Sequence, residues 1–310
     1  MRTLYHRIKD SLMDIYQLKD TSEWEYEPDL KVPIVGVYHV YCEKGWEPIV
    51  RRQMDTLRRS GLLERTSRFC VSVITLHDDD LDRLRAVIDT PKLEIIAVNT
   101  DPSVYEYPAL NFIRQCAQEG DALFYYFHSK GISYQALDTN DRRFRSFVSK
   151  IVAWCEMLEY FIFDQWRVAV NTLTHGYDAY GCYQWPPREY TMFSGNFWWT
   201  TASYVRTLPA FDEEVIRKSR FYSEVWLYEH PLRVFSPFES SADLYFVRIP
   251  RSLYTMQHPP LLDHLRFVTV CNWRKMLKHV FRYNYKYANQ GRYQKLIIRK
   301  NSPCPAQSDL

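Results

Sequence analysis

Residues 32–41 read VPIVGVYHVY, an unbroken apolar and β-branched run that predicts a buried strand. Similar runs follow at residues 69–76, 93–98 and 122–127, and segments with helical spacing separate them, at residues 46–59, 81–88 and 108–118. Strands that alternate with helices predict a parallel sheet with helices on both faces. We therefore expect an α/β, Rossmann-like fold with a mostly parallel sheet flanked by helices.

The rest of the chain is expected to add shorter elements and two terminal segments. We predict helices at residues 142–163, 202–207 and 217–229, short strands at residues 168–173 and 177–183, a late strand within residues 247–256, and a basic helix up to about residue 285. The expected domains are an N-terminal helix and connector (1–30), a main domain (31–260, with halves 31–135 and 136–260) and a basic helical C-terminal extension (261–310).

Composition excludes several classes of protein. The net charge of +3 is too small to predict nucleic-acid binding. Neither a GxGxxG nor a GxxxxGK[ST] pattern occurs, which argues against a Rossmann dinucleotide site and a P-loop. Seven cysteines without a CxxC pair favour a reducing compartment over a disulfide or zinc framework. Because no secretory signal or bilayer-spanning apolar run is visible, we expect a cytoplasmic protein.

Positive charge is concentrated near the C-terminus. No acid interrupts a series of basic residues formed by Arg266, Arg274, Lys275, Lys278, Arg282, Lys286, Arg292, Lys295, Arg299 and Lys300. Such a segment is either a solvated helix and tail or a surface for an anion, either the phosphates of a membrane or a lipid-diphosphate acceptor. Peripheral contact with the inner face of a membrane is one expectation.

Polar side chains follow each predicted strand. Ligands of parallel α/β sheets bind at the carboxyl ends of the strands. The residues expected there are His39 and Tyr41, Asp78, Asp79 and Asp80, Asn99 and Asp101, and His128, Ser129 and Lys130. The three adjacent acids have a second interpretation, because an acid after a strand is often only a helix cap.

Residues 193–213, FSGNFWWTTASYVRTLPAFDE, combine a turn with aromatic side chains. Gly195 and Asn196 both tolerate a left-handed backbone, so they predict a tight turn. Trp198 and Trp199 follow at once, and Trp226 and Glu224 come later in the chain. Exposed aromatic faces would suit sugar rings and a carboxylate could accept a proton from a hydroxyl. The alternative is that the tryptophans belong to the core and that Glu224 is solvated.

The order of these segments resembles the GT-A glycosyltransferases, over residues 32–260. The resemblance implies that Tyr38 to Tyr41 and Asp78 to Asp80 bind the nucleoside of a nucleotide-sugar, and that Asn111 belongs to a small-basic-Asn signature in which Leu110 replaces the basic residue. Phe127-His-Ser-Lys-Gly131 stands where the family has its metal-binding Asp-x-Asp. Either His128, Ser129 and Lys130 bind the diphosphate directly, or His128 holds a metal with a remote His such as His258 and an acid. Imidazole suits Mn²⁺ better than Mg²⁺.

The resemblance also implies an activity. Ser194, Gly195, Asn196, Trp198, Trp199 and Trp226 would form the sugar and acceptor side, and Glu224 would be the general base of an inverting transfer. Similar short glycosyltransferases occur in bacterial surface-polysaccharide clusters and large DNA viruses. The expected partners are a nucleotide-diphospho-sugar donor and a glycan or lipid-linked acceptor.

Three other classes remain open. A non-catalytic carbohydrate-binding pseudoenzyme would keep the aromatic residues and dispense with Asp-x-Asp. A nucleotidyltransferase shares the alternating sheet but usually needs a Gly-rich basic loop, which residues 32–46 lack. An interaction scaffold would use its aromatic side chains to dock a protein.

Overall fold

The computed structural model describes residues 15–132, 142–184, 191–211 and 221–283. Contacts divide the chain into two compact units. Unit 1 comprises Met1–Gln17, Ser133–Trp154 and Ser240–Leu310, and unit 2 comprises Leu18–Ile132 and Cys155–Glu239. The functional segments expected from the sequence, with boundaries after residues 30, 135 and 260, are a different division and stay a prediction.

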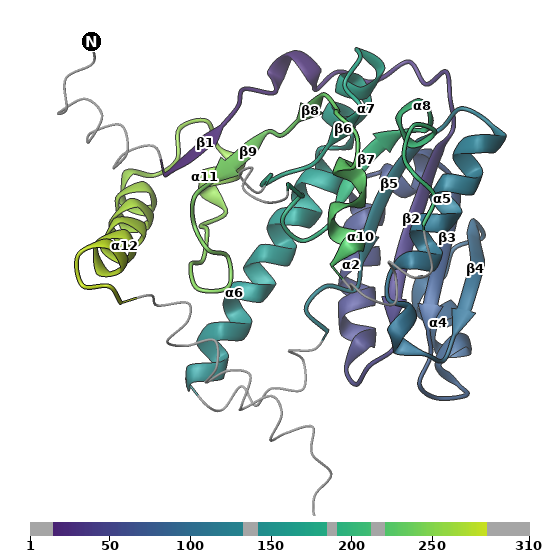
Figure 1. Ribbon diagram of the computed structural model, residues 1–310, viewed down its shortest axis with the longest axis horizontal. Helices are drawn as coiled ribbons and strands as arrows, with labels where there is room; N and C mark the ends of the chain where they lie inside the picture. Colours follow the sequence, from purple (N-terminus) through teal and green to yellow (C-terminus); the bar gives the residue numbers. More distant parts are fainter. Residues whose placement is uncertain (1–14, 133–141, 185–190, 212–220, 284–310) are drawn as a thin grey trace, which may run out of the picture. The chain divides into compact units, whose positions relative to one another are not determined.

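Unit 2 contains a seven-stranded sheet in the order β4-β3-β2-β5-β7-β6-β8 (Figure 1). Its strands are β2 (Ile34–Tyr41), β3 (Thr66–Ile74), β4 (Leu93–Asn99), β5 (Leu123–His128), β6 (Ala179–Tyr180), β7 (Trp198–Thr201) and β8 (Val234–Phe235). Only β7 runs antiparallel to its neighbours, β5 and β6. The expected α/β class, a mostly parallel sheet flanked by helices, is confirmed.

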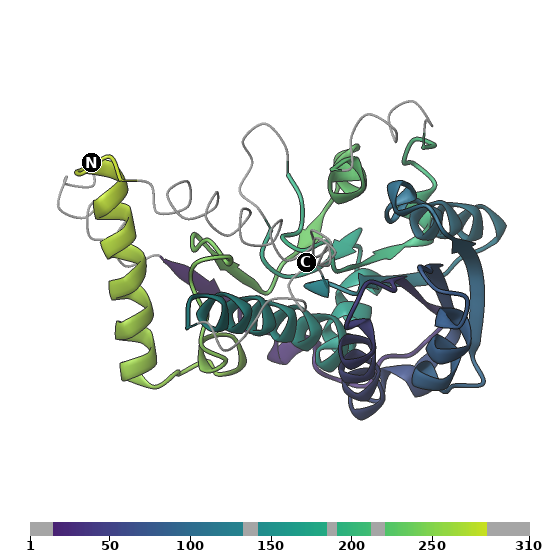
Figure 2. The same cartoon turned by 90° about the horizontal axis from the view of Figure 1, so that it is seen from below.

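Helices cover both faces of this sheet (Figure 2). They are α2 (Trp46–Arg59), α3 (Leu62–Arg65), α4 (Asp80–Ile88), α5 (Tyr107–Glu119), α7 (Trp166–Thr174), α8 (Ala202–Val205) and α10 (Tyr222–Val225), with single turns η1 (Ser22–Trp24), η2 (Pro102–Val104) and η5 (Trp226–Tyr228). On one face Tyr126 and Trp198 pack with apolar residues of α5 and α8. On the other, the Tyr38 hydroxyl donates to Gln53 of α2 at 2.6 Å.

The order of the strands creates a switch point between β2 and β5. The chain steps from β2 outward through β3 to β4, and then returns to place β5 on the other side of β2. In open α/β sheets the crevice outside the carboxyl ends of the strands at such a point is where ligands bind. His39 of β2 and His128 of β5 are partners in the register of these two strands, at this end.

Close packing in the sheet explains why residue 36 is a glycine. A Cβ atom on this residue would lie 2.3 Å from the Tyr125 ring, which is closer than any real contact. The Tyr125 hydroxyl forms a buried hydrogen bond with Thr66 Oγ1 at 3.0 Å. Replacing Gly36 would therefore displace a ring at the centre of the sheet.

Two predicted elements of unit 2 need comment. Residues 168–173, predicted as a strand, lie in the helix α7, which is almost wholly buried. A short, uniformly apolar run has no periodicity that separates a strand from a buried helix, and here the helix formed. The helix predicted at residues 217–229 is described only from residue 221 onward, where α10 and η5 occupy it.

Unit 1 contains α11 (Ser252–Thr255), α12 (Leu261–His279) and the first turns of α6 (Arg142–Glu159). Trp154 of α6 packs edge-on against Tyr245, with ring centroids 5.0 Å apart. β1 (Tyr16–Leu18) and β9 (Phe238–Ser240) form a separate two-stranded sheet. Within the described residues, no helix of either unit has the length and apolar character needed to cross a bilayer.

The terminal predictions are confirmed in part. The late strand predicted within residues 247–256 is wrong, because residues 247–250 are irregular and α11 follows; Pro250 cannot donate to a strand ladder. The basic C-terminal helix is confirmed as α12. The helix expected near the N-terminus falls on residues 1–14, and the basic tail on residues 284–310, which lie outside the described residues.

Candidate functional site

The carboxyl ends of β2 and β5 are tied together by hydrogen bonds. The Ser129 amide donates to the His39 carbonyl at 3.0 Å, and the Ser129 hydroxyl accepts from the Tyr41 amide at 3.0 Å. Gln53 Nε2 donates to the His128 carbonyl at 3.1 Å. Ser129 is buried and its hydroxyl is engaged by the backbone, so its observed role is to join the two strands.

Glu106, at the residue before α5, is the centre of a buried polar cluster. Its Oε2 accepts from the Tyr126 hydroxyl at 2.9 Å and from Asn196 Nδ2 at 2.6 Å, and its Oε1 lies 3.8 Å from His128 Nδ1. The carboxylate thus links the start of α5 to β5 and to the turn before β7. Because these groups come from distant parts of the chain, only folding assembles them.

The Glu106 carboxylate is ionised at neutral pH. Burial by itself would raise its pKa, but attraction to His128 and His39 in their protonated forms, with the hydrogen bonds from Tyr126 and Asn196, holds the pKa below its usual range. A buried carboxylate is stable only with such partners. The cluster therefore carries negative charge beside two imidazoles.

The predicted turn at Gly195 and Asn196 is confirmed. Both residues have positive φ, 102° and 55°, which is the backbone for which glycine and asparagine are suited. The Gly195 carbonyl accepts from His128 Nε2 at 3.0 Å, while Asn196 Oδ1 accepts from Trp198 Nε1 at 2.9 Å. The bond to a carbonyl means that His128 carries its proton on Nε2.

Both histidines are neutral at pH 7. Burial lowers the pKa of His128; the Glu106 carboxylate opposes this shift and the charge of Lys130 adds to it. Burial also lowers the pKa of His39, to about 4. His39 Nδ1 is buried and has no hydrogen-bond partner among the described residues. Since leaving such an atom unpaired costs about 1–3 kcal/mol, it is a candidate ligand contact.

Lys130 and Glu224 both belong to the surroundings of this cluster. The charge of Lys130 acts on His128. Burial raises the pKa of the Tyr126 phenol, and Glu106 and then Glu224 raise it further. Lys130 and Glu224 therefore each act electrostatically on a residue of the Glu106 cluster.

The three tryptophans are core residues. Trp198, Trp199 and Trp226 are 1%, 0% and 0% exposed. Trp198 and Trp199 are consecutive in β7, so their side chains point to opposite faces of the sheet, and helices cover both faces. Trp226 packs against Phe211, with ring centroids 4.8 Å apart. The predicted stacking of these indoles on sugars is wrong, because no ring face is open to a ligand.

The predicted nucleoside contacts are divided between core and surface. Tyr38 is fully buried and stacks on Phe127 at 4.1 Å. Asp80 is also fully buried, and its Oδ2 accepts from the amides of Leu76 and His77, both at 2.8 Å. It therefore holds the loop between β3 and α4 rather than a ligand. Asp78, Asp79, Asp101 and Asn111 are exposed, Asn99 and Tyr41 are half-buried, and Ser194 is buried.

The predicted metal set is not assembled in either unit. His258 is exposed and belongs to unit 1, whereas His128 belongs to unit 2. Among the described residues, no group of three or more His, Cys, Asp or Glu side chains could hold a metal ion. The Oε2 of Glu106 already accepts two hydrogen bonds, so the described side chains do not by themselves supply a binding site for Mn²⁺ or Mg²⁺.

Sequence reasoning missed Glu106, Tyr126 and Gln53. Glu106 had a detectable signal, since it is an acid directly before a predicted helix, in the connection that follows the third strand. Tyr126 had none, because one tyrosine in the run FYYF is indistinguishable from its neighbour until the sheet decides which face each one occupies.

No protein-family model and no curated protein sequence matches the chain. Similar solved structures include a protein described as a nucleotide-diphospho-sugar transferase from Desulfovibrio desulfuricans, 11% identical, covering 87% of this chain and 98% of its own, with a TM-score of 0.37. Two others are 4-diphosphocytidyl-2C-methyl-D-erythritol synthases, the second from Anaerococcus prevotii. They are 10% and 6% identical and cover 78% and 77% of this chain and 100% and 99% of their own, with TM-scores of 0.31 and 0.33. Likeness at this level does not define a function, and the fold class rests on the strand order.

Proposed function

We propose that the chain is a glycosyltransferase that moves a sugar from a nucleotide-diphospho-sugar to a glycan or lipid-linked acceptor in polysaccharide biosynthesis. The observation that supports it is the buried cluster of Glu106, His39, His128 and Asn196 at the β2/β5 switch point. A set of groups with shifted pKa values at the carboxyl edge of a parallel sheet is typical of a ligand site.

The donor would lie across the ends of β2 and β5. The leaving diphosphate gains negative charge as the glycosidic bond breaks, and Lys130 would stabilise that charge. His39 would hydrogen-bond the donor through Nδ1. His128, whose two nitrogens face Gly195 and Glu106, would position the turn rather than touch phosphate. Asp78, Asp79, Tyr41 and Asn111 stay proposed contacts of the nucleoside.

The acceptor would approach from the side of α10. Glu224 would take the proton of the acceptor hydroxyl, so that its oxygen attacks the anomeric carbon in line and inverts it. Ser194, Gly195 and Asn196 would shape this side through the backbone of the turn. The backbone of residues 191–211 would then define the shape of the acceptor side, and the buried tryptophans of this segment would keep the turn in place.

The cofactor and cellular location belong to the same proposal. A divalent ion, Mn²⁺ or Mg²⁺, would take most of its ligands from the donor diphosphate and water, as Mg²⁺ commonly does. We place the protein in the cytoplasm, at the inner face of a membrane, which its basic C-terminal segment would contact.

A matched pair of variants tests the base. Glu224→Gln should reduce transfer by about 100-fold or more, the usual range for loss of a general base, with the Kd for UDP or GDP unchanged. Glu229→Gln, an exposed acid a few residues later, should leave both properties unchanged. Full transfer activity in the first variant would refute the role of Glu224.

The second candidate is a carbohydrate-binding pseudoenzyme. The lack of a three-residue metal group among the described residues favours it. Titration with UDP and GDP, with and without Mn²⁺, separates the two, because a pure lectin should bind neither nucleotide. Glycan binding without nucleotide binding would replace the enzyme proposal with this one.

A further inference from the structure

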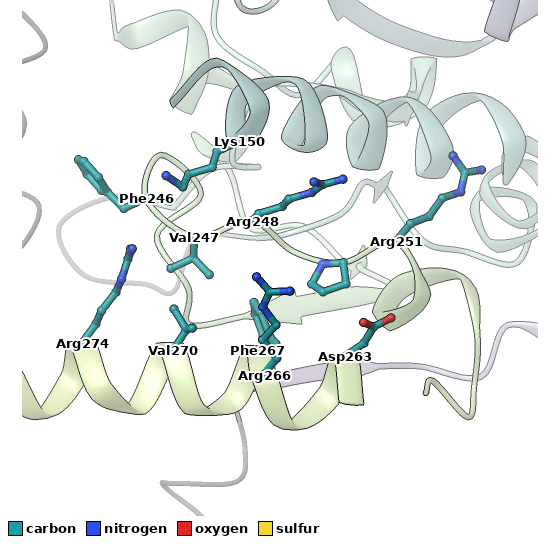
Figure 3. Close-up of a pocket in the computed structure, with 11 residues that line it drawn as sticks. Lys150, Phe246, Val247, Arg248, Arg251, Asp263, Arg266, Phe267, Val270 and Arg274 are labelled. Carbon is teal, nitrogen blue, oxygen red and sulfur yellow. The ribbon is translucent and has the colours of Figure 1, made fainter. Parts of the chain in front are cut away.

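Unit 1 contains a pocket with an unusual charge. Its volume is about 460 Å³, and α12, the first turns of α6 and the segment before α11 line it (Figure 3). Five basic side chains and one acidic side chain stand around it, namely Lys150, Arg248, Arg251, Arg266, Arg274 and Asp263. The remaining lining is apolar. This arrangement differs from the neutral histidine cluster of unit 2.

The acid does not neutralise the arginines. Asp263 accepts a hydrogen bond from the Ser252 hydroxyl at 2.6 Å, which holds it at the end of the pocket beside α11. Within the described part of the chain, neither Arg248 nor Arg266 forms an ion pair. Figure 3 shows both side chains between α6 and α12. Their repulsion would be relieved by an anion.

Lys150, which is half-buried, lies in the same positive potential. Burial lowers the pKa of Lys150, and the charge of Arg274 lowers it further. Phe246, Val247 and Phe267, which also line the pocket, are buried. Arginine side chains around an apolar base match a phosphate group, because each guanidinium can donate two hydrogen bonds to its oxygens.

The exposed apolar side chains of α12 indicate which kind of molecule would carry such a phosphate group. Leu262, Leu265, Trp273 and Met276 recur at helical spacing and are all exposed, with Leu262 at 77% and Trp273 at 55%. We call these four residues the outer face of α12. The helix packs through a different side, which contains Phe267, Val268 and Cys271.

The pocket and the outer face are adjacent on the helix. Arg266 and Arg274 each follow a residue of the outer face, one position or about 100° further round the helix. A helix with an exposed apolar stripe, a tryptophan and flanking basic residues is suited to the interface of an anionic bilayer. The charge of the pocket is complementary to that of lipid phosphates.

We propose that unit 1 binds the phosphate group of a membrane phospholipid in this pocket, while the outer face of α12 rests in the headgroup region. This inference rests on the membrane contact in the proposed function and extends it to particular residues. It does not depend on glycosyl transfer, since its test measures binding alone.

The test uses the full chain and two sources of phosphate. Vesicles of phosphatidylcholine, with and without phosphatidic acid, measure lipid binding by co-sedimentation, and inorganic pyrophosphate measures pocket binding by calorimetry. The pocket variant carries Arg248→Gln and Arg266→Gln, and the face variant carries Leu262→Ser and Trp273→Ser. The controls are Lys31→Gln with Arg51→Gln, two exposed basic residues of unit 2, for charge, and Met256→Ser, for an exposed apolar residue off α12.

The wild type should bind acidic vesicles and pyrophosphate. The pocket variant should bind both roughly 10-fold or more weakly, the usual effect of losing charged hydrogen bonds. The face variant should lose vesicle binding and keep pyrophosphate binding. All control variants should stay within about 2-fold of the wild type, since long-range charge alone is screened by salt. Circular dichroism melting curves confirm that each variant is folded.

Several results would overturn the proposal. Equal losses in the pocket variant and the charge control would reduce the effect to net charge. Binding of pyrophosphate without binding of acidic vesicles would support the phosphate pocket and overturn the lipid source. A dimer in light scattering that the face variant abolishes would mean that a second copy covers α12. If the wild type binds acidic vesicles and pyrophosphate but shows no glycosyl transfer in a separate assay, the lipid proposal is supported and only the proposed enzyme activity is refuted.

Discussion

Glu106 is the residue whose replacement tests the candidate site most directly. Glu106→Ala would remove the acceptor of the Tyr126 hydroxyl and the closer of two acceptors of Asn196 Nδ2 among the described residues. Both donors are buried, with Tyr126 fully enclosed and Asn196 3% exposed. Glu106→Gln would instead keep an oxygen where Oε2 stands. The two variants separate the loss of hydrogen bonds from the loss of charge.

The expected magnitudes follow from the two donors. A buried donor without an acceptor costs about 1–3 kcal/mol, so two cost about 2–6 kcal/mol. Removing a buried carboxylate offsets part of this, and we expect Glu106→Ala to lower the free energy of unfolding by about 2–4 kcal/mol. Glu106→Gln should lower it by about 1 kcal/mol or less, since neutral hydrogen bonds replace charged ones while the burial of charge is relieved.

Urea unfolding followed by tryptophan fluorescence measures these differences, and thermal melting checks them. Glu119→Ala, at the other end of α5 and exposed, is the matched control and should change stability by less than about 0.5 kcal/mol. If Glu106→Ala unfolds at the same urea concentration as the wild type, the cluster does not hold the turn to α5 and β5. If the Gln and Ala variants are equally destabilised, charge rather than hydrogen bonding is the main contribution.

Three further perturbations test other features of unit 2. Burial lowers the pKa of His39 from 6.5 to about 4, so the unfolded chain binds a proton at this residue before the folded chain does. The free energy of unfolding should therefore fall by about 3 kcal/mol as the pH falls from 6.5 to about 4, and should not depend on this residue above pH 6.5. His39→Gln should flatten this pH dependence in urea unfolding, and an unchanged slope would contradict the burial of a neutral imidazole. Trp198→Phe should cost about 1–3 kcal/mol, because Asn196 loses its indole donor, with UDP affinity within about 3-fold; a stable variant with lost affinity would restore the stacking interpretation. Asp80→Asn should cost about 1–3 kcal/mol in chemical denaturation, since its oxygens accept backbone amides, whereas the exposed Asp79→Asn should cost less than about 0.5 kcal/mol. Equal effects at these two positions would refute the loop-locking role of Asp80.

Local sequence signals were sufficient for the first part of the fold. The predicted helix at residues 46–59 is α2 to the residue, and the four predicted strands are β2 to β5 with small shifts at their ends. Buried β-branched runs and amphipathic spacing are properties of neighbouring residues, so they are visible without coordinates. The signals failed where a short apolar run was uniformly buried, as in α7.

The sequence by itself determined that polar side chains follow the strands and that Gly195 and Asn196 turn the chain. Only the tertiary structure decided what those side chains do. Helices on both faces of the sheet enclose Trp198 and Trp199. One of the two rings would have been exposed if helices covered only one face. The cluster of Glu106 with Asn196 joins residues 90 positions apart. A pairing at that separation depends on the order of the strands, which periodicity does not encode.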